Sequence, residues 1–209
     1  VAFWGASLQK IPDGGWFPLV VAGVFFVAMT TWKKGRQILE ERLSEKTIPY
    51  ESLIDDVAAT EPVRVPGTAV YMHSKPDKAP PAMVDNLQHN QVLHERVIDL
   101  TVVTREIPYV DPNERAEIFE YGENMYQVIL EFGFAEDPDV PEALREFDIG
   151  GEGFDIEDTT FFLGREYLVA TDKPGMALWR DRLFARMSRN ARPATSFFRL
   201  PADRVVELT

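Results

Sequence analysis

Residues 16–32, WFPLVVAGVFFVAMTTW, form a run of 17 uncharged and mostly apolar residues, and the cationic stretch KKGR follows directly. A bilayer core is about 30 Å thick and needs about 20 residues of helix to cross it. Trp16 and Trp32 stand at the two ends, where indole rings favour the membrane–water interface. Together with the two glycines before it, the run predicts one transmembrane helix over residues 14–32. The alternative is a buried helix of a soluble domain, which is usually shorter or carries a polar face.

The charges beside the run predict its orientation. Lys33, Lys34 and Arg36 come after it, whereas Lys10 and Asp13 before it nearly cancel. Cationic residues are retained on the cytoplasmic side, so we expect the segment after the run in the cytoplasm. A secretory signal peptide has the opposite order, with its positive charge before the apolar segment. The chain also opens with the apolar stretch VAFWGASL and no Met, so we expect it to be the end of a longer protein.

The rest of the chain is strongly acidic. Residues 37–209 hold 18 of the 22 Lys and Arg residues and 33 of the 34 Asp and Glu residues, a formal net charge of −15. A domain with this charge is a poor general binder of nucleic acid, because phosphate neutralisation supplies most non-specific affinity. The chain contains no cysteine, which excludes disulfides, thiolate metal sites and a cysteine nucleophile.

Downstream of the apolar run, helical and extended patterns alternate. Residues 36–46 are predicted either to continue the membrane helix or to form a short interfacial helix. Strand, helix and strand within residues 67–107 predict a βαβ unit with a parallel pair. Residues 116–134 predict a β-hairpin with its turn at residues 121–124. The other predicted helices are 50–60, 80–91, 140–147 and 175–191, and the last is amphipathic, with Leu178, Leu183, Phe184 and Met187 expected on its apolar face. Strands are expected at 67–73, 95–107, 159–171 (a pair or one bent strand) and near the C-terminus.

These elements predict an α+β fold with a mixed β-sheet, with α/β as the alternative, preceded by one transmembrane α-helix. Residues 61–67, EPVRVPG, are predicted to be a linker because they contain two prolines. The acidic, glycine-rich residues 148–158 are predicted to be a mobile loop. The expected organisation is the end of a transmembrane region (1–36), a helical connector (37–62) and a cytoplasmic C-terminal domain (63–209).

One candidate polar cluster lies between the helix at 80–91 and the strand at 95–107, and consists of His89, Asn90, His94, Glu95 and Arg96. The two histidines are five residues apart, not the four that would place them on one helical face, which disfavours a zinc site. Structural hydrogen bonding is the preferred interpretation, since buried polar groups usually have local partners. A regulatory ligand is the alternative.

A second candidate is a row of arginines in the predicted amphipathic helix 175–191 and after it, formed by Arg180, Arg182, Arg186, Arg189, Arg192 and Arg199, of which the first five are the candidate anion contacts. The simpler interpretation is that they pair with the protein's own carboxylates. The functional interpretation is an anion site, because guanidinium groups bind phosphate through paired hydrogen bonds. A nucleotide messenger or a lipid headgroup would then be the ligand.

The sequence resembles the C-terminal end of KUP-type bacterial potassium uptake transporters over nearly all of residues 9–208. The segments that carry the resemblance are KIPDGGWFPL, MTTWKKGR, RVPGTAVYM, HNQVLHERVIDLTVVT, DTTFFLGRE, PGMALWRDRLFA and SRNARPATSFFRLPADRVVEL. The resemblance implies a multi-pass potassium:proton symporter of the bacterial plasma (inner) membrane. The chain would then supply the last transmembrane helix and a cytoplasmic domain that serves assembly or regulation.

In that family the potassium site belongs to earlier helices, so no ion-binding residue and no cofactor is assigned here. The implied partners are the rest of the membrane core, the bilayer, and potassium and protons through the whole protein, with a homodimer left open. Sequence signatures of hydrolases, phosphate-binding loops and zinc proteases (GxSxG, GxxxxGKS/T and HExxH) are absent, so no enzyme is predicted. The alternative function is a stand-alone membrane-anchored binding domain with an unknown ligand, a nucleotide among the candidates.

Overall fold

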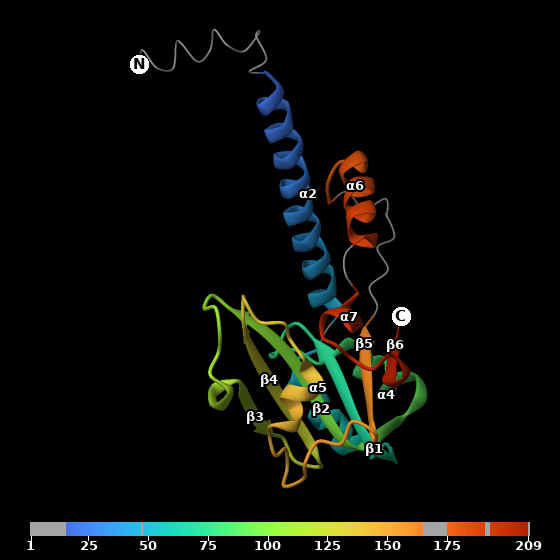
Figure 1. Ribbon diagram of the computed structural model, residues 1–209. Helices are drawn as coiled ribbons and strands as arrows, with labels where there is room; N and C mark the ends of the chain where they lie inside the picture. The colour runs from blue at the N-terminus through green and yellow to red at the C-terminus, as the bar shows by residue number, and fades with distance from the viewer. Residues whose placement is uncertain (1–15, 47, 165–174, 191–192, 209) are drawn as a thin grey trace. The chain divides into compact units, whose positions relative to one another are not determined.

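The computed structural model describes residues 16–46, 48–164, 175–190 and 193–208. These residues belong to two compact units. One unit contains the helices α2 and α6, and the other contains the six described strands, as labelled in Figure 1.

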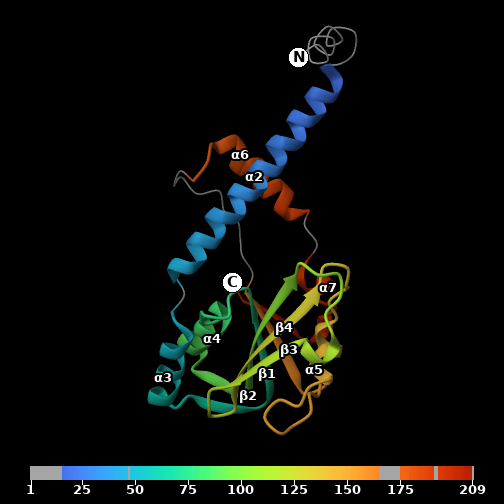
Figure 2. The same ribbon diagram turned by 90° about the vertical axis from the view of Figure 1, so that its left-hand side faces the viewer.

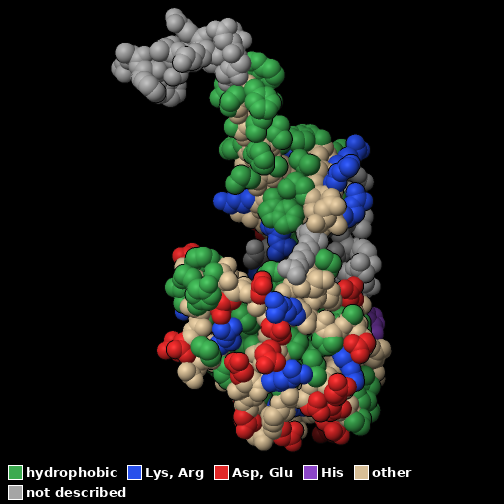
Figure 3. Space-filling model, in the orientation of Figure 1, with side chains coloured by type: hydrophobic (Ala, Val, Ile, Leu, Met, Phe, Trp, Pro, Cys, Tyr) green, Lys and Arg blue, Asp and Glu red, His purple; other side chains and the backbone are tan. Residues whose placement is uncertain are grey.

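The first unit is built on α2 (Trp16–Lys46), a single helix of 31 residues. The connector at 36–46 therefore continues the apolar helix. The segment Trp16–Leu39, with a mean hydropathy of 1.4, is long and apolar enough to cross a membrane. Its apolar side chains are largely exposed, as at Phe26 (69%) and Met29 (70%), and Figure 3 shows them over the visible face of α2. Exposed apolar surface on this scale needs lipid or other membrane helices around it.

Helix α6 (Leu178–Arg189) packs on the C-terminal half of the span, and the two helices cross in Figure 2. The Phe184 ring lies edge-on to Trp32, with 5.5 Å between ring centroids. The same ring also fills a notch in the surface of α2, which exists because Gly35 has no side chain. A Cβ atom at position 35 would lie only 2.4–2.6 Å from the ring. Arg180 Nε donates a hydrogen bond to Thr31 Oγ1 at 3.0 Å. The predicted amphipathic helix is confirmed, but Leu178, expected on its packed face, is 63% exposed.

The second unit is a six-stranded mixed sheet with the order β3-β4-β2-β1-β5-β6. Neighbouring strands run parallel except β3 and β4, which form the predicted antiparallel hairpin. The predicted parallel βαβ unit is also confirmed, as β1, α4 and β2. The strands are β1 (Val63–His73), β2 (Val92–Arg105), β3 (Ala116–Glu120), β4 (Met125–Gly133), β5 (Thr159–Gly164) and β6 (Val205–Leu208).

Both faces of this sheet are covered, which explains the continuous apolar runs in its central strands. On one face, a core around Ile98 and Leu100 packs with α5 (Val140–Arg145). On the other, a core around Tyr71 packs with α3 and α4. These helices are α3 (Tyr50–Thr60) and α4 (Pro81–Asn90), and short turns occur at α7 (Ala194–Phe197), η2 (Pro112–Glu114) and η3 (Ala202–Arg204).

The predicted linker at 61–67 is wrong in part, because β1 begins at Val63. The first residues of β1 pair with β2, and the register then shifts between Val65 and Thr68. Gly67 adopts φ +98°, a conformation that favours glycine. Pro66, one of the two prolines on which the linker prediction rested, and Gly67 thus lie at a register shift inside a strand. Part of the predicted strand 159–171 lies outside the described residues.

Glu136 ties the end of β4 to the loop that precedes β3. Its carboxylate accepts hydrogen bonds from Gly133 N at 2.5 Å and Val110 N at 3.1 Å, and pairs with Arg115 Nη2 at 2.6 Å. The Arg115 guanidinium also lies 4.7 Å from the centroid of the Phe132 ring. Burial works to raise the pKa of Glu136, but these hydrogen bonds and the Arg115 charge outweigh it and hold the pKa below its usual value of 4.5.

We predict that Glu136→Ala lowers the free energy of unfolding by about 1.5–3 kcal/mol at neutral pH, since it removes hydrogen bonds to a charged group. A depressed pKa stabilises the fold above the unfolded pKa of about 4.5, and this contribution is lost as pH falls through the lower folded value. Urea unfolding of the detergent-solubilised chain at neutral and acidic pH checks this. The exposed Glu142→Ala is the control, and an equal deficit for Glu136→Ala at both pH values would contradict the assignment.

Candidate functional site

The most deeply buried charged residue described in the sheet unit is Asp99, in the middle of β2. His73, the last residue of β1, places Nε2 2.5 Å from Asp99 Oδ1, and their side chains are 8% and 0% exposed. The two side chains are in direct contact, although Oδ1 has no hydrogen bond of good geometry. Gln127 of β4 donates from Nε2 to Asp99 Oδ2 at 3.1 Å and to Pro76 O at 2.5 Å. Three adjacent strands therefore meet at one carboxylate.

Two tyrosines extend this buried polar group toward α3 and the hairpin. Their rings, Tyr50 and Tyr121, lie with centroids 4.9 Å apart. Tyr121 OH donates to Gln127 Oε1 at 3.4 Å, whereas the buried Tyr50 OH has no hydrogen-bond partner. Burial, followed by the charge of Asp99, raises the pKa of Tyr50 far above its usual value. Burial also raises the pKa of Asp99, against the opposing effects of His73 and Gln127.

None of the candidate site residues predicted from the sequence belongs to this buried polar group. The available signal was a single carboxylate, Asp99, inside the apolar strand segment VIDLTVV. Its partners come from distant segments, so only the sheet register reveals them. The Asp99 carboxyl at the centre of this polar group can hold a proton or a negative charge. Among the described residues no set of three His, Cys, Asp or Glu side chains is arranged to hold a metal ion.

The five residues of the predicted polar cluster have separate surroundings. His89, in the last turn of α4, is exposed, and Asn90 Nδ2 donates to Asn86 Oδ1 at 2.8 Å. The His94 ring lies edge-on to Phe162, its buried Nδ1 has no hydrogen-bond partner, and burial lowers its pKa.

Arg96, the most buried member of that cluster, holds the loop that was predicted to be mobile. Its guanidinium donates to the carbonyl oxygens of Gly153 at 3.2 Å and Glu152 at 2.9 Å, and to that of Ile149. These bonds bring the acidic loop onto the sheet at the N-terminal part of β2. The mobility of the loop stays a prediction.

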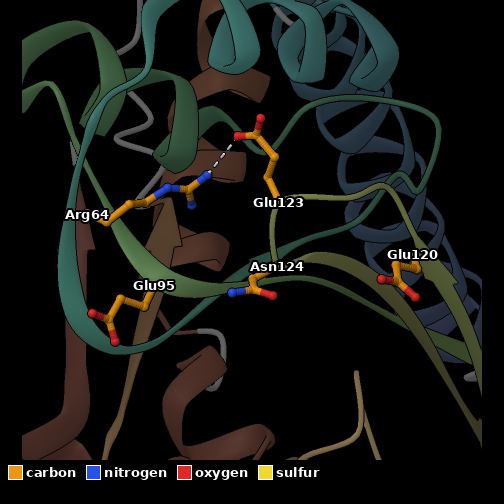
Figure 4. A pocket seen from close by; sticks show the side chains of 5 residues that line it. All are labelled: Arg64, Glu95, Glu120, Glu123 and Asn124. Atoms are coloured by element: carbon orange, nitrogen blue, oxygen red, sulfur yellow. Dashed lines mark hydrogen bonds and ion pairs between the residues drawn. The ribbon is translucent and has the colours of Figure 1, made fainter.

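Glu95 instead lines a shallow hollow of about 520 Å³ with Arg64, Glu120, Glu123 and Asn124, shown in Figure 4. Arg64 extends toward Glu123 and pairs with it at 3.3 Å. Three carboxylates against one guanidinium make the hollow unsuited to phosphate, because like charges repel.

The predicted arginine row divides between two environments. Arg180 is directed to Thr31 of α2, while Arg182, Arg186 and Arg189 are exposed. Arg192 lies outside the described residues. Arg199, beyond the helix, pairs with Asp137 at 3.3 Å and Asp139 at 3.4 Å. This is the pairing expected at Arg199 if the arginines bind the protein's own carboxylates.

We predict that Asp99→Asn flattens the pH dependence of the unfolding free energy. A raised pKa means that stability is fully present below the unfolded pKa near 3.8 and is lost as pH rises through the folded value. The neutral amide removes this loss, which amounts to about 1.4 kcal/mol per unit of pKa difference. Urea unfolding from acidic to neutral pH measures it. The exposed Asp137→Asn is the control, and parallel curves for wild type and Asp99→Asn would contradict the prediction.

The chain matches two family models. Residues 66–209 match the K+ potassium transporter C-terminal domain, and residues 1–37 match the K+ potassium transporter integral membrane domain. No solved structure matches.

Similar curated proteins include the "Probable potassium transport system protein Kup" of Myxococcus xanthus, 48% identical over 208 residues, which cover 100% of this chain and 32% of that protein. The protein of the same description from Erythrobacter litoralis is 49% identical over 207 residues, covering 99% of this chain and 33% of the relative. The chain thus spans about a third of the length of these relatives. The C-terminal domain model covers most of the described sheet unit, and the membrane-domain model ends inside α2. The chain therefore belongs to the Kup family of potassium transporters, which is a family of transporters and not of enzymes.

Proposed function

We propose that this chain is the C-terminal part of a bacterial potassium:proton symporter, and that its sheet unit serves assembly or regulation of potassium uptake. The observation that carries the proposal is the continuity of α2, which begins within the membrane-domain match and ends beyond it. The ion site would lie in a membrane core outside this chain, which spans about a third of the length of its relatives. Lys33, Lys34 and Arg36 after the apolar run support a cytoplasmic sheet unit in a plasma-membrane protein.

Regulation through this connection requires that the transporter has at least two states that the sheet unit stabilises differently. A change of packing or of self-association in the sheet unit would then act on the membrane core through α2. The helix is uninterrupted from Trp16 to Lys46, which is the continuity that transmission of a rotation or displacement requires. A homodimer of the sheet units would provide such a change of state, and it stays a prediction.

We predict that potassium uptake depends on the stiffness of the part of α2 that follows the apolar run 16–32. In the full-length parent protein, Gln37→Gly with Glu41→Gly should reduce uptake or abolish its regulation, since each glycine costs about 1 kcal/mol of helix stability relative to alanine. The matched control replaces the same two residues by alanine, which removes the same side chains but keeps the helix. Uptake is measured in a bacterium that lacks its own potassium importers, at equal amounts of protein in the membrane. Equal uptake by both variants would refute coupling through α2.

A truncation tests the role of the sheet unit itself. The parent protein cut after Arg36 is compared with the intact protein in the same uptake assay. Uptake by the intact protein alone would make the sheet unit necessary, and the amount of truncated protein in the membrane would separate assembly from regulation. Faster uptake by the truncated protein would assign an inhibitory role, and unchanged uptake and regulation would contradict the proposal.

The sheet order favours a second candidate, a regulatory ligand-binding domain. The parallel strands have the spatial order β4-β2-β1-β5-β6, in which the chain direction across the sheet reverses between β1 and β5. Ligands of open α/β sheets bind beyond the carboxyl ends of the strands at such a switch point. His73 ends β1 at this edge. A nucleotide bound there at 100 times its Kd would stabilise the chain by about 2.7 kcal/mol, so thermal unfolding with mononucleotides and cyclic dinucleotides tests the idea.

A further inference from the structure

Helix α6 has two chemically different faces. The face toward α2 is centred on Phe184, which is 6% exposed, with Arg180 beside it. The opposite face carries the exposed Leu178 (63%), Trp179 (56%), Arg182, Arg186 and Arg189. Positions 182, 186 and 189 recur at helical spacing, so their guanidinium groups share one side of the helix.

This outer face is cationic in an otherwise acidic chain. Helix α6 contains four arginines and one aspartate, a net charge of +3, whereas the whole chain carries −12. Two large apolar side chains stand at the N-terminal end of the same face. Exposed aromatic and aliphatic side chains next to arginines are typical of helices that lie in a membrane interface.

The contacts with α2 fix where this face lies along the membrane span. Thr31 and Gly35, which receive Arg180 and Phe184, stand toward the C-terminal end of the span Trp16–Leu39. In that part of α2, Trp32 marks the expected membrane–water boundary. With the boundary at Trp32, α6 is expected at the depth of the lipid phosphates, within reach of its arginines.

We propose that the outer face of α6 binds the anionic surface of the bilayer that α2 crosses. Leu178 and Trp179 would enter the boundary between headgroups and acyl chains, and Arg182, Arg186 and Arg189 would contact lipid phosphates through paired hydrogen bonds. A free nucleotide is the weaker alternative, since small ligands are normally enclosed by a concave site. An extended lipid surface needs only an exposed face, and this is what α6 provides.

The test uses the absence of native cysteine. Asn190→Cys, at the exposed C-terminal end of α6, carries a fluorophore, and the chain is reconstituted in vesicles of phosphatidylcholine alone or with about one third phosphatidylglycerol. A small fraction of lipid with a nitroxide on its headgroup quenches fluorophores at the membrane surface. We expect stronger quenching in the anionic vesicles, and weaker quenching there at high salt, because salt screens charges near a surface.

Replacing Arg182, Arg186 and Arg189 by glutamine should lower the ratio of lipid-bound to free α6 about 100-fold, roughly fivefold for each arginine near an anionic surface. The matched control makes the same replacement at Arg105, Arg145 and Arg204, which lie at the surface of the sheet unit. The control changes the net charge equally and should leave the quenching unchanged.

Three results would overturn the proposal. The first is equal quenching in neutral and anionic vesicles, and the second is loss of quenching when inorganic phosphate or nucleotide is added at constant ionic strength, which would indicate a free-anion site. The third is protection of the same label in the full-length parent, which would make the transporter's own membrane core the occupant. None of these results depends on potassium uptake, so the proposal fails or holds separately from the proposed function.

Discussion

The constraint on which this structure depends is the cost of exposing the apolar surface of α2 to water. Side chains such as Phe25 (64% exposed) and Phe26 (69%) have no protein cover among the described residues. Each buried apolar Å² is worth roughly 25 cal/mol, so a helix with this surface is stable only inside a bilayer or against other membrane helices. The span therefore anchors the C-terminal remainder of the chain.

The sheet unit meets a different constraint, which is to provide partners for the charged side chains that its two-sided core buries. Asp99 is compensated by His73 and Gln127 from the neighbouring strands, and Arg96 by loop carbonyl oxygens. Removing one partner of a buried charge usually costs more than the pair contributes, because the remaining charge is left in a low dielectric. We therefore expect such groups to specify strand register and loop position more than they add net stability.

Helix α6 shows why sequence periodicity predicts the existence of a helix better than its orientation. The pattern of residues 175–191 placed Leu178 with Phe184 on one apolar face, yet only Phe184 is buried. The deciding contact is the fit of the Phe184 ring into the notch at Gly35, a residue far away in the sequence. Similarly, the arginine row looked uniform, but Arg180 turns to Thr31 while the other described members of the row face outward.

The sequence by itself determined the membrane-spanning helix, the acidic character of residues 37–209, the βαβ unit and the hairpin, because each depends on local composition and short-range periodicity. It also carried the family resemblance. Only the tertiary structure decided that residues 63–65 pair with β2 despite the adjacent Pro66 and Gly67, that Asp99 meets His73, and that α6 joins α2. These outcomes depend on pairing between segments distant in the chain, and the energy of such pairing is invisible to any local window of sequence.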